Sequence, residues 1–304
     1  MTPKAATSDP QLSAQIAALP CWSGAVTIEP LAGGMTNRNF LVSDRSGARH
    51  VVRVGRDLPE HGVLRFNELA AARAAHAAGI SPQVVYAGDG MLVSRFVEGR
   101  TLAAGDVRDP GQLARIVELV RACHEQVPLH LRGPALMFWV FQVIRNYAAL
   151  LDEPGSNRLG VALAPLAARA ALLEQALGPV RIVFGHNDLL AANFIDDGAR
   201  LWLIDWDYAG FNSPLFDLAN LASNNAFTSE LDERLLGAYF GAAVDAACRR
   251  GFAAMKCASL LREALWGCVS LAHSRIDFDY AGYARDYLQR FDHAWQGFER
   301  GRGA

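Results

Sequence analysis

The first third of the chain alternates short apolar runs with polar turns. Residues 25–31, 39–43 and 50–54 are brief runs rich in apolar and β-branched side chains, separated by segments that contain glycine or charged residues. Such runs, with turn residues between them, predict the strands of a small antiparallel sheet. Residues 83–86 and 91–96 predict two further strands.

One helix interrupts this strand pattern. From Val63 onward, apolar and alanine side chains recur with a period near 3.6 residues, which is typical of an amphipathic helix. Gly79 stands where the pattern stops, and glycine is suited to end a helix because it adopts the left-handed conformation without a steric penalty. The sequence therefore predicts a helix from 63 to 79 inside the sheet-forming region.

Beyond Gly99 the pattern becomes helical and stays so almost to the end of the chain. The segments with a helical pattern are 111–125, 134–151, 162–177, 214–226, 231–248, 252–273 and 280–298, and the strand-like interruptions are 181–184, 193–195 and 201–204. We therefore predict an α+β protein with two lobes, a small antiparallel-sheet N-terminal lobe (1–97) and a larger helical C-terminal lobe (98–304).

Composition narrows the classes of function. The chain has 304 residues, of which 51% are hydrophobic, so it is long enough for one large core or two modest ones. A net charge of -2 gives no general attraction to nucleic acid or to anionic lipid, and we expect neither as a partner. Residues 1–20 lack the apolar stretch of a secretory signal, and no later apolar run approaches membrane-spanning length.

The cysteines indicate the redox environment. The chain has five, an odd number, and none stands in a C-x-x-C pattern, so neither a disulfide framework nor a zinc knuckle is expected. Buried thiols in a reducing cytoplasm fit this pattern best. The sequence leaves the oligomeric state open, with a dimer as one option.

The segment from His186 to Asp205 contains the residues with the clearest chemistry. His186, Asp188 and Asn193 fit the pattern H-x-D-x-x-x-x-N, and Asp205 follows a short apolar strand. This spacing is typical of kinases, in which the loop aspartate receives the proton of the substrate hydroxyl. Asn193 and Asp205 offer the oxygen ligands that Mg²⁺ prefers. We therefore predict Asp188 as the catalytic base and Asn193 and Asp205 as magnesium ligands.

This segment has two alternative interpretations. Asp188 or Asn193 alone would be better explained as a turn residue, but their combination with Asp205 favours catalysis. His186 and Asp188 are also close enough to be ligands of a metallohydrolase. The other histidines are scattered without a second ligand cluster, which makes that alternative weaker.

An upstream loop has the composition of a phosphate-binding segment. Gly33, Gly34, Thr36 and Asn37 lie between two predicted strands. Glycine lets the backbone approach phosphate oxygens, and threonine and asparagine side chains donate hydrogen bonds. A glycine pair between strands is more often a simple hairpin, so the expectation rests on the position of this loop ahead of Arg53.

Arg53 and Glu68 complete the predicted ATP site. Arg53 lies in the strand 50–54 and Glu68 on the helix that follows, where they can form the strand-to-helix ion pair known from kinases. A guanidinium can bind phosphate oxygens and a carboxylate at the same time. By its order in the chain, the run 91–97 supplies the backbone edge for adenine.

Taken together, these motifs resemble those of the choline and ethanolamine kinases, within the wider group of aminoglycoside phosphotransferase-like kinases. The resemblance covers most of the chain and rests on the segments GGMTNRNF, VVRV, GHNDLLAANF and LIDWDYAGFNSPLFDLAN. It implies a protein-kinase-like two-lobed fold that uses ATP and Mg²⁺. It also implies that an arginine is normal at position 53.

The same resemblance points to the acceptor site. The family holds the quaternary ammonium of choline in a box of aromatic rings on its last helices, and Trp266 and Tyr283 match two of those positions. Trp266 on an apolar helix could instead be an ordinary core residue. Two differences bear on the substrate: Val269 stands where eukaryotic choline kinases have a second tryptophan, and Asn224 stands where they have an acidic residue.

The sequence therefore predicts ATP-dependent phosphorylation of a small alcohol, with choline or ethanolamine as the first candidates. An aminoglycoside or thiamine kinase of the same fold is the alternative enzyme. A nucleotide-binding regulator without catalysis is the alternative outside the enzymes, although no acid or metal ligand is missing from the motifs.

Overall fold

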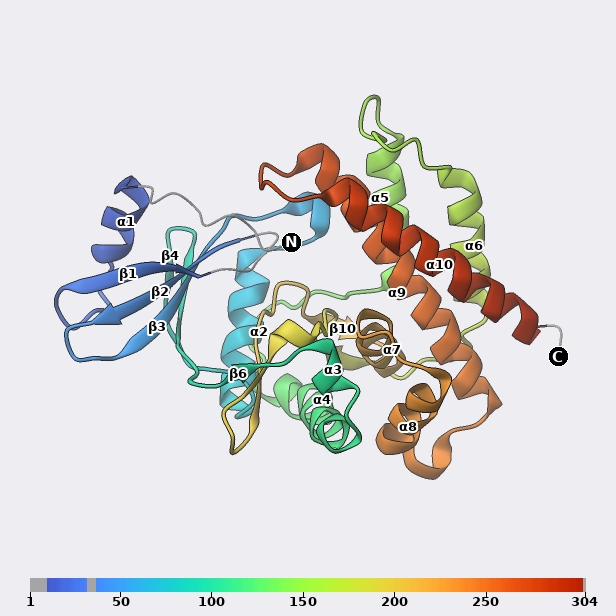
Figure 1. Cartoon of the computed structure of the whole chain (residues 1–304), viewed down its shortest axis with the longest axis horizontal. Coiled ribbons are helices and arrows are strands. Elements are labelled where there is room, and N and C mark those ends of the chain that lie inside the picture. Colours follow the sequence, from blue (N-terminus) through green and yellow to red (C-terminus); the bar gives the residue numbers. More distant parts are fainter. Residues whose placement is uncertain (1–9, 32–36, 303–304) are drawn as a thin grey trace.

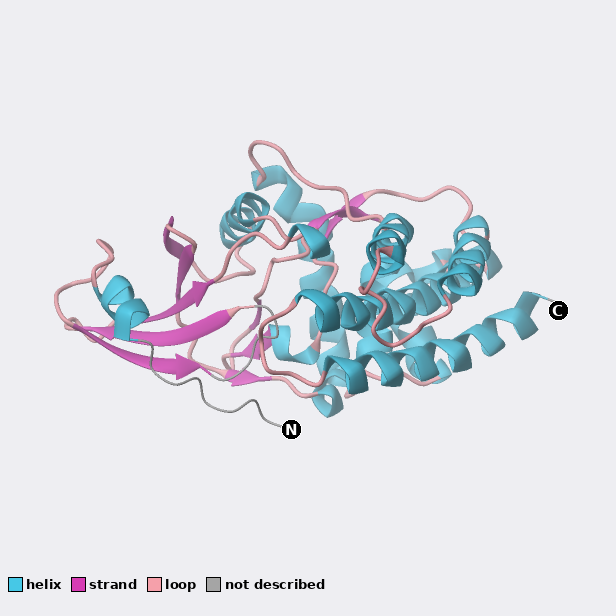
Figure 2. Ribbon diagram, turned by 90° about the horizontal axis from the view of Figure 1, so that it is seen from above, coloured by secondary structure: helices cyan, strands magenta, loops and turns pink. Residues whose placement is uncertain are grey.

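A five-stranded antiparallel sheet forms the N-terminal end of the molecule. The computed structural model describes residues 10–31 and 37–302. Figure 1 shows the sheet at one end and the helical part at the other, and the view from above in Figure 2 shows the same separation. The order of strands across the sheet is β1 (Val26–Leu31), β2 (Arg38–Asp44), β3 (Arg49–Val54), β5 (Met91–Arg95) and β4 (Val84–Gly88). The five strands predicted from the apolar runs are thus confirmed.

Alternating side chains give this sheet its own small core. Phe40 and Val42 on β2, Val52 on β3 and Val93 on β5 are buried on one face, as the two-residue period of a strand requires. They pack with α1 (Pro10–Ala17), which contributes Leu12 and Ile16 to the same cluster. This packing holds the first three strands in a fixed register, in which Phe40 lies opposite Val52.

The helix α2 (Arg65–Ala77) lies between the sheet and the helical part. Its buried alanines belong to the large core of the C-terminal part, while Glu68 is buried on the same helix near Arg53 of the sheet. Small alanine side chains let α2 approach α4 (Pro110–His130) closely. The lobe boundary at residue 97 stays a prediction. The helix α2 lies before this boundary in the sequence, but its buried alanines pack in the core of the C-terminal part.

The C-terminal part is built around one long buried helix, α9 (Ala246–His273). It packs against α5, α7 and α10 and is buried over most of its length from Gly251 to Ser270. The other helices are α3 (Ala104–Val107), α5 (Val140–Asp152), α6 (Leu163–Gln175), α7 (Pro214–Asn224), α8 (Ser229–Phe240) and α10 (Tyr280–Arg302). Together with the sheet, these helices confirm the predicted α+β fold.

Two small sheets carry the loops with the predicted catalytic residues. The strand β7 (Val183–Gly185) pairs with β10 (Gly210–Asn212), and β8 (Phe194–Asp196) pairs with β9 (Leu201–Leu203) and β6 (Arg100–Thr101). His186 therefore follows directly after β7, Asn193 directly precedes β8, and Asp205 follows β9. The strands β6 and β10, like the helices α1 and α3, were not predicted.

Several helix boundaries predicted from the sequence are wrong. The helix predicted at 134–151 begins at Val140, because the preceding segment is extended and its Phe138 amide donates to the Phe211 carbonyl over 2.9 Å. The helix predicted at 231–248 ends at Phe240, where Gly241 turns the chain with a φ of 61°. The next helix already begins at Ala246, because Asp245 caps it.

Within the described residues, no helix is both long and apolar enough to cross a membrane. All five cysteines lie in the described part of the chain and are free thiols.

Candidate functional site

The loop after β7 carries Asp188 and is tied to the start of α7. The backbone amides of His186 and Asn187 donate to the two carboxylate oxygens of Asp217, over 2.8 and 2.7 Å. One turn further along α7, the side chain of Asn220 accepts from the amide of Leu189 over 2.6 Å. Three of the five residues from 186 to 190 donate their backbone amides to α7, so the position of Asp188 is fixed by a helix about thirty residues away in the sequence.

Asp217 is fully buried, and a histidine supports its charge. His124 Nε2 donates to the Asp217 carboxylate over 2.9 Å, and His124 Nδ1 forms a hydrogen bond of 2.7 Å with the Tyr239 hydroxyl. Burial disfavours the ionised carboxylate, but the hydrogen bond and the charge of His124 hold the pKa of Asp217 below its usual value. Asp217 was not predicted from the sequence, although it lies in the segment FDLAN that follows Asp205.

His186 lies beneath the loop. Its side chain is fully buried, its Nε2 donates to the Ile204 carbonyl over 2.9 Å, and its ring packs edge-on against Trp206. Burial lowers the pKa of His186, so the ring is neutral and one nitrogen serves as donor. Its contacts position the residue just before Asp205, whereas a direct catalytic role for His186 stays a prediction.

Asp188 is a strong candidate for a proton acceptor. Its side chain keeps 15% of its surface exposed, and Nη1 of the buried Arg262 lies 3.8 Å from its carboxylate. Burial raises the pKa of Asp188 well above its usual value, Arg262 opposes this and Glu263 adds to it. A higher pKa makes a carboxylate a better base for an alcohol proton.

The backbone of Asn193 is hydrogen-bonded to that of the residue before Asp205. The Asn193 side-chain amide donates to the Asp188 backbone carbonyl over 2.8 Å, and the Ile204 amide donates to the Asn193 carbonyl over 3.0 Å. Asp205 has a φ of 71°, an unusual conformation for a residue other than glycine and one that occurs most often at functional sites. The Asn193 side-chain oxygen and the Asp205 carboxylate are hard oxygen donors, which fit Mg²⁺.

No cluster of three or more His, Cys, Asp or Glu side chains suited to a metal ion occurs in the described ranges. Asn193 and Asp205 would therefore supply only part of a coordination shell. This fits Mg²⁺, which commonly binds through one or two protein ligands together with water and substrate phosphates.

Arg53 is the centre of a buried ion-pair cluster. It contacts Glu68, Asp205 and Asp207, with a distance of 2.7 Å to Asp207, and only 12% of its side chain is exposed. Burial works against its charge, but the three carboxylates raise the pKa of Arg53 well above its usual value. The predicted pair of Arg53 with Glu68 is thus present, and Asp205 links this cation to the catalytic loops.

Arg65, Asp207 and Asn37 extend the cluster. Arg65 pairs with Glu68 and, over 2.9 Å, with Asp207. Asn37 donates to Asp207 over 3.0 Å and accepts from Arg65 over 3.0 Å, so the end of the predicted phosphate loop contacts the catalytic segment. Burial raises the pKa of Asp207 to about 6, with Arg53 opposing this effect. Arg65 and Asp207 were not predicted from the sequence, although Asp207 lies in the LIDWD motif and Arg65 lies three residues before Glu68.

The other members of the predicted phosphate loop cannot be placed. Gly33, Gly34 and Thr36 lie outside the described residues. Their role in ATP binding stays a prediction, as does that of Asn37.

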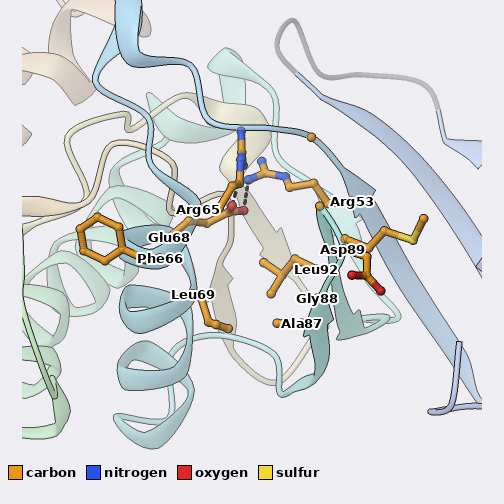
Figure 3. A pocket seen from close by; sticks show the side chains of 12 residues that line it. Arg53, Arg65, Phe66, Glu68, Leu69, Ala87, Gly88, Asp89 and Leu92 are labelled. Carbon is orange, nitrogen blue, oxygen red and sulfur yellow. Dashed lines mark hydrogen bonds and ion pairs between the residues drawn. The ribbon is translucent and has the colours of Figure 1, made fainter.

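Two cavities adjoin the Arg53 cluster. One of about 220 Å³ lies between α2 and the β4–β5 turn, with Arg53, Glu68, Leu69 and Asp89 in its lining (Figure 3). The second, of about 160 Å³, opens between the five-stranded sheet and the C-terminal part. Its lining includes Val51, Leu92 and Phe96 from the sheet side, and Ile195, Ile204 and Asp205 from the catalytic side. A cavity lined by both apolar side chains and charged groups suits a nucleotide base with its phosphates.

The predicted aromatic pair on the last helices is in contact. The rings of Trp266 on α9 and Tyr283 on α10 have centroids 5.4 Å apart at an angle of 67°. Trp266 is 4% exposed, and its indole nitrogen donates to the Tyr208 hydroxyl over 2.9 Å. The tertiary structure therefore brings the two residues together, while their role in binding a substrate stays a prediction.

Comparisons with known proteins agree with this architecture. A sequence model described as choline/ethanolamine kinase matches residues 28–234. Protein LicA of Haemophilus influenzae is 28% identical over 211 residues, which cover 68% of this chain and 61% of LicA. The chain thus matches less than two thirds of the length of this curated relative.

Solved structures resemble the whole chain. A choline/ethanolamine kinase family protein from Mesorhizobium loti is 30% identical, with a TM-score of 0.76 over 96% of this chain and 97% of that one. A spectinomycin phosphotransferase solved with ADP and spectinomycin shares the fold at 12% identity, with a TM-score of 0.65 over 96% of this chain and 99% of that one. These likenesses confirm the protein-kinase-like fold. The match of a family model to more than half of the chain, together with this similarity in structure, shows that the chain belongs to the choline/ethanolamine kinase family.

Proposed function

We propose that this protein transfers the γ-phosphoryl group of ATP to the hydroxyl of a small amino alcohol, with choline or ethanolamine as the acceptor. The observation that carries the proposal is the meeting of Asp188, Asn193 and Asp205 with the Arg53 ion-pair cluster at one site. A base, a pair of magnesium ligands and a phosphate-binding cation are the parts that phosphoryl transfer to an alcohol requires.

Asp188 would act as the proton acceptor. The acceptor hydroxyl hydrogen-bonds to the Asp188 carboxylate, its oxygen forms a bond to the γ-phosphorus, and the bond from that phosphorus to the bridging oxygen breaks. ADP leaves with the electron pair of the broken bond, and the hydroxyl proton goes to Asp188. The raised pKa of Asp188, which results from its burial, favours this proton transfer.

Arg53 would bind phosphate oxygens of ATP while it remains paired with Glu68. Asn193 and Asp205 would hold Mg²⁺, which neutralises phosphate charge when it is bound. The space between the sheet and the catalytic loops would take the adenine base, since apolar side chains line it from both sides.

Substrate screening with ATP and Mg²⁺, read out as release of ADP, tests this function. The panel should contain choline, ethanolamine, an aminoglycoside and thiamine. We expect turnover of the amino alcohols, and we expect Asp188→Asn to lower kcat by about 10²- to 10⁴-fold, because the substitution removes a general base. ATP binding by this variant should remain within about threefold of that of the original protein, because the carboxylates paired with Arg53 are those of Glu68, Asp205 and Asp207.

Asp292→Asn is a matched control, because this carboxylate is 58% exposed and pairs with Arg169 on the surface. It should leave kcat unchanged. Near-normal turnover by Asp188→Asn would remove Asp188 from its proposed role. If only the aminoglycoside or thiamine is phosphorylated, that compound and not the amino alcohol is the substrate. If ATP binds but no compound is phosphorylated, the result favours a nucleotide-binding regulator.

A further inference from the structure

A buried ion pair on α9 lies directly beside the proposed catalytic base. Arg262 has only 1% of its side chain exposed, and its Nη1 contacts the Glu263 carboxylate and lies 3.8 Å from that of Asp188. Its guanidinium lies over the Tyr208 ring, 4.2 Å from the centroid. One nitrogen therefore faces two carboxylates, and these lie close enough for a two-carbon amino alcohol to reach both.

The charges of this group do not cancel. Two carboxylates, Asp188 and Glu263, share one guanidinium, so the ionised group carries one net negative charge in a buried setting. A buried charge without a partner is costly. An acceptor with a single positive charge would therefore be attracted to this group and would complete its neutralisation.

Hydrogen bonds hold the Glu263 carboxylate in place. The Tyr283 hydroxyl on α10 donates to Glu263 Oε2 over 2.8 Å. The Tyr283 ring packs against Tyr287, whose hydroxyl donates to the Asn224 side-chain oxygen over 3.3 Å. Within this chain of contacts from α9 to α7, Glu263 is the anionic member, since Asn224 and the tyrosines are neutral.

The aromatic rings nearby are packed against one another. Trp266 has the rings of His61, Tyr280 and Tyr283 around it, with centroids 5.5, 5.8 and 5.4 Å away. A quaternary ammonium group has no N–H and is bound through open ring faces. A primary ammonium group has three N–H donors and needs oxygen acceptors instead. Oxygen acceptors are what Asp188 and Glu263 present beside these closely packed rings.

We propose that Glu263, held by Arg262 and Tyr283, is the carboxylate that binds the ammonium group of the acceptor, and that it makes the site select a primary over a quaternary ammonium. The proposal rests on the proposed function, because it places the acceptor hydroxyl at Asp188. The hydroxyl and the ammonium of one small molecule then lie between the two carboxylates that share Arg262.

The test is a series of four acceptors that differ only in methylation: ethanolamine, its N-methyl and N,N-dimethyl derivatives, and choline. The original protein should show a kcat/KM that falls along this series, by at least about tenfold from ethanolamine to choline, because each methyl group removes a charge-assisted hydrogen-bond donor. A kcat/KM for choline equal to or above that for ethanolamine overturns the inference and leaves the proposed function intact. Turnover of none of the four refutes the proposed function and this inference with it.

Glu263→Gln keeps the shape of the side chain and removes its charge. We expect the preference for ethanolamine over choline to shrink by about tenfold in this variant, with most of the change in KM. A merely structural defect would instead lower kcat/KM for both acceptors by the same factor, and that result overturns the assignment of Glu263. Tyr283→Phe, which removes the hydroxyl that holds Glu263, should change the preference in the same direction and carries the test if Glu263→Gln does not fold. An unchanged preference in the folded variant is the second overturning result.

Discussion

Asp217 offers the sharpest test of how the catalytic loop is positioned. Its two carboxylate oxygens accept three hydrogen bonds, from the amides of His186 and Asn187 and from His124 Nε2, over 2.7 to 2.9 Å. Asp217→Asn keeps one side-chain oxygen and replaces the other by an NH₂ group. This group is a donor, so it cannot accept the hydrogen bonds that the lost oxygen accepted. At least one charge-assisted bond is lost, worth about 1.5–3 kcal/mol, and one buried N–H is left without an acceptor, which costs about 1–3 kcal/mol more.

We therefore expect Asp217→Asn to lower the free energy of unfolding by about 3–5 kcal/mol, measured by denaturant unfolding with tryptophan fluorescence. The kcat should fall at least about tenfold with little change in the KM for ATP, because the loop that carries Asp188 is displaced while the Arg53 cluster is intact. Asp292→Asn serves again as the control and should change the free energy of unfolding by less than about 0.5 kcal/mol. A free energy of unfolding within about 1 kcal/mol of that of the original protein, together with a normal kcat, would refute the reasoning that Asp217 anchors the loop.

Two further predictions concern stability. Burial, with Arg262 and His273 adding to it, lowers the pKa of His61 from 6.5 to about 3, so the unfolded chain takes up the proton first as the pH falls. As the pH falls between those values, the free energy of unfolding should decrease by up to about 1.4 kcal/mol per pH unit. His61→Asn should remove this part of the slope, and equal slopes of the free energy of unfolding against pH in the original protein and the variant would contradict the prediction. Gly99→Ala should cost about 1–3 kcal/mol, because its Cβ would lie 2.7 Å from the Asp196 carbonyl oxygen. Gly237→Ala lies in a helix, and no atom lies within 4 Å of the Cβ that it adds, so this variant should instead stabilise the protein by about 0.5–1 kcal/mol. Equal shifts of the melting temperature in the two variants would rule this contrast out.

The sequence was most informative where structure depends on near neighbours. The short apolar runs between turn residues predicted all five strands of the N-terminal sheet, because strand-forming side chains and turn residues act locally along the chain. The spacing between His186 and Asn193 likewise predicted one loop, since Asn193 bonds back to Asp188 only five residues away. The family resemblance, built on such local motifs, is confirmed.

The ends of the helices were harder to predict from the sequence. The segment before Val140 has a helical pattern, but pairing with Phe211, far along the chain, holds it extended. The break after Phe240 depends on Gly241 in a left-handed conformation, and the restart depends on the Asp245 cap. A hydrophobic period continues through such points, so it does not mark them.

The sequence by itself determined the chemical groups available for phosphoryl transfer, because these groups lie in short motifs. It also determined the α+β arrangement that presents them, because the helices and strands follow from local periodicity. Only the tertiary structure decided which distant groups meet: Asp217 under the loop of Asp188, Asp207 at Arg53, and Arg262 with Glu263 beside the proposed base. These contacts join residues between about 30 and 150 positions apart, and their formation depends on how helices pack against the sheet and against one another. No periodicity along the chain encodes that packing, since it arises from the burial of many side chains at once.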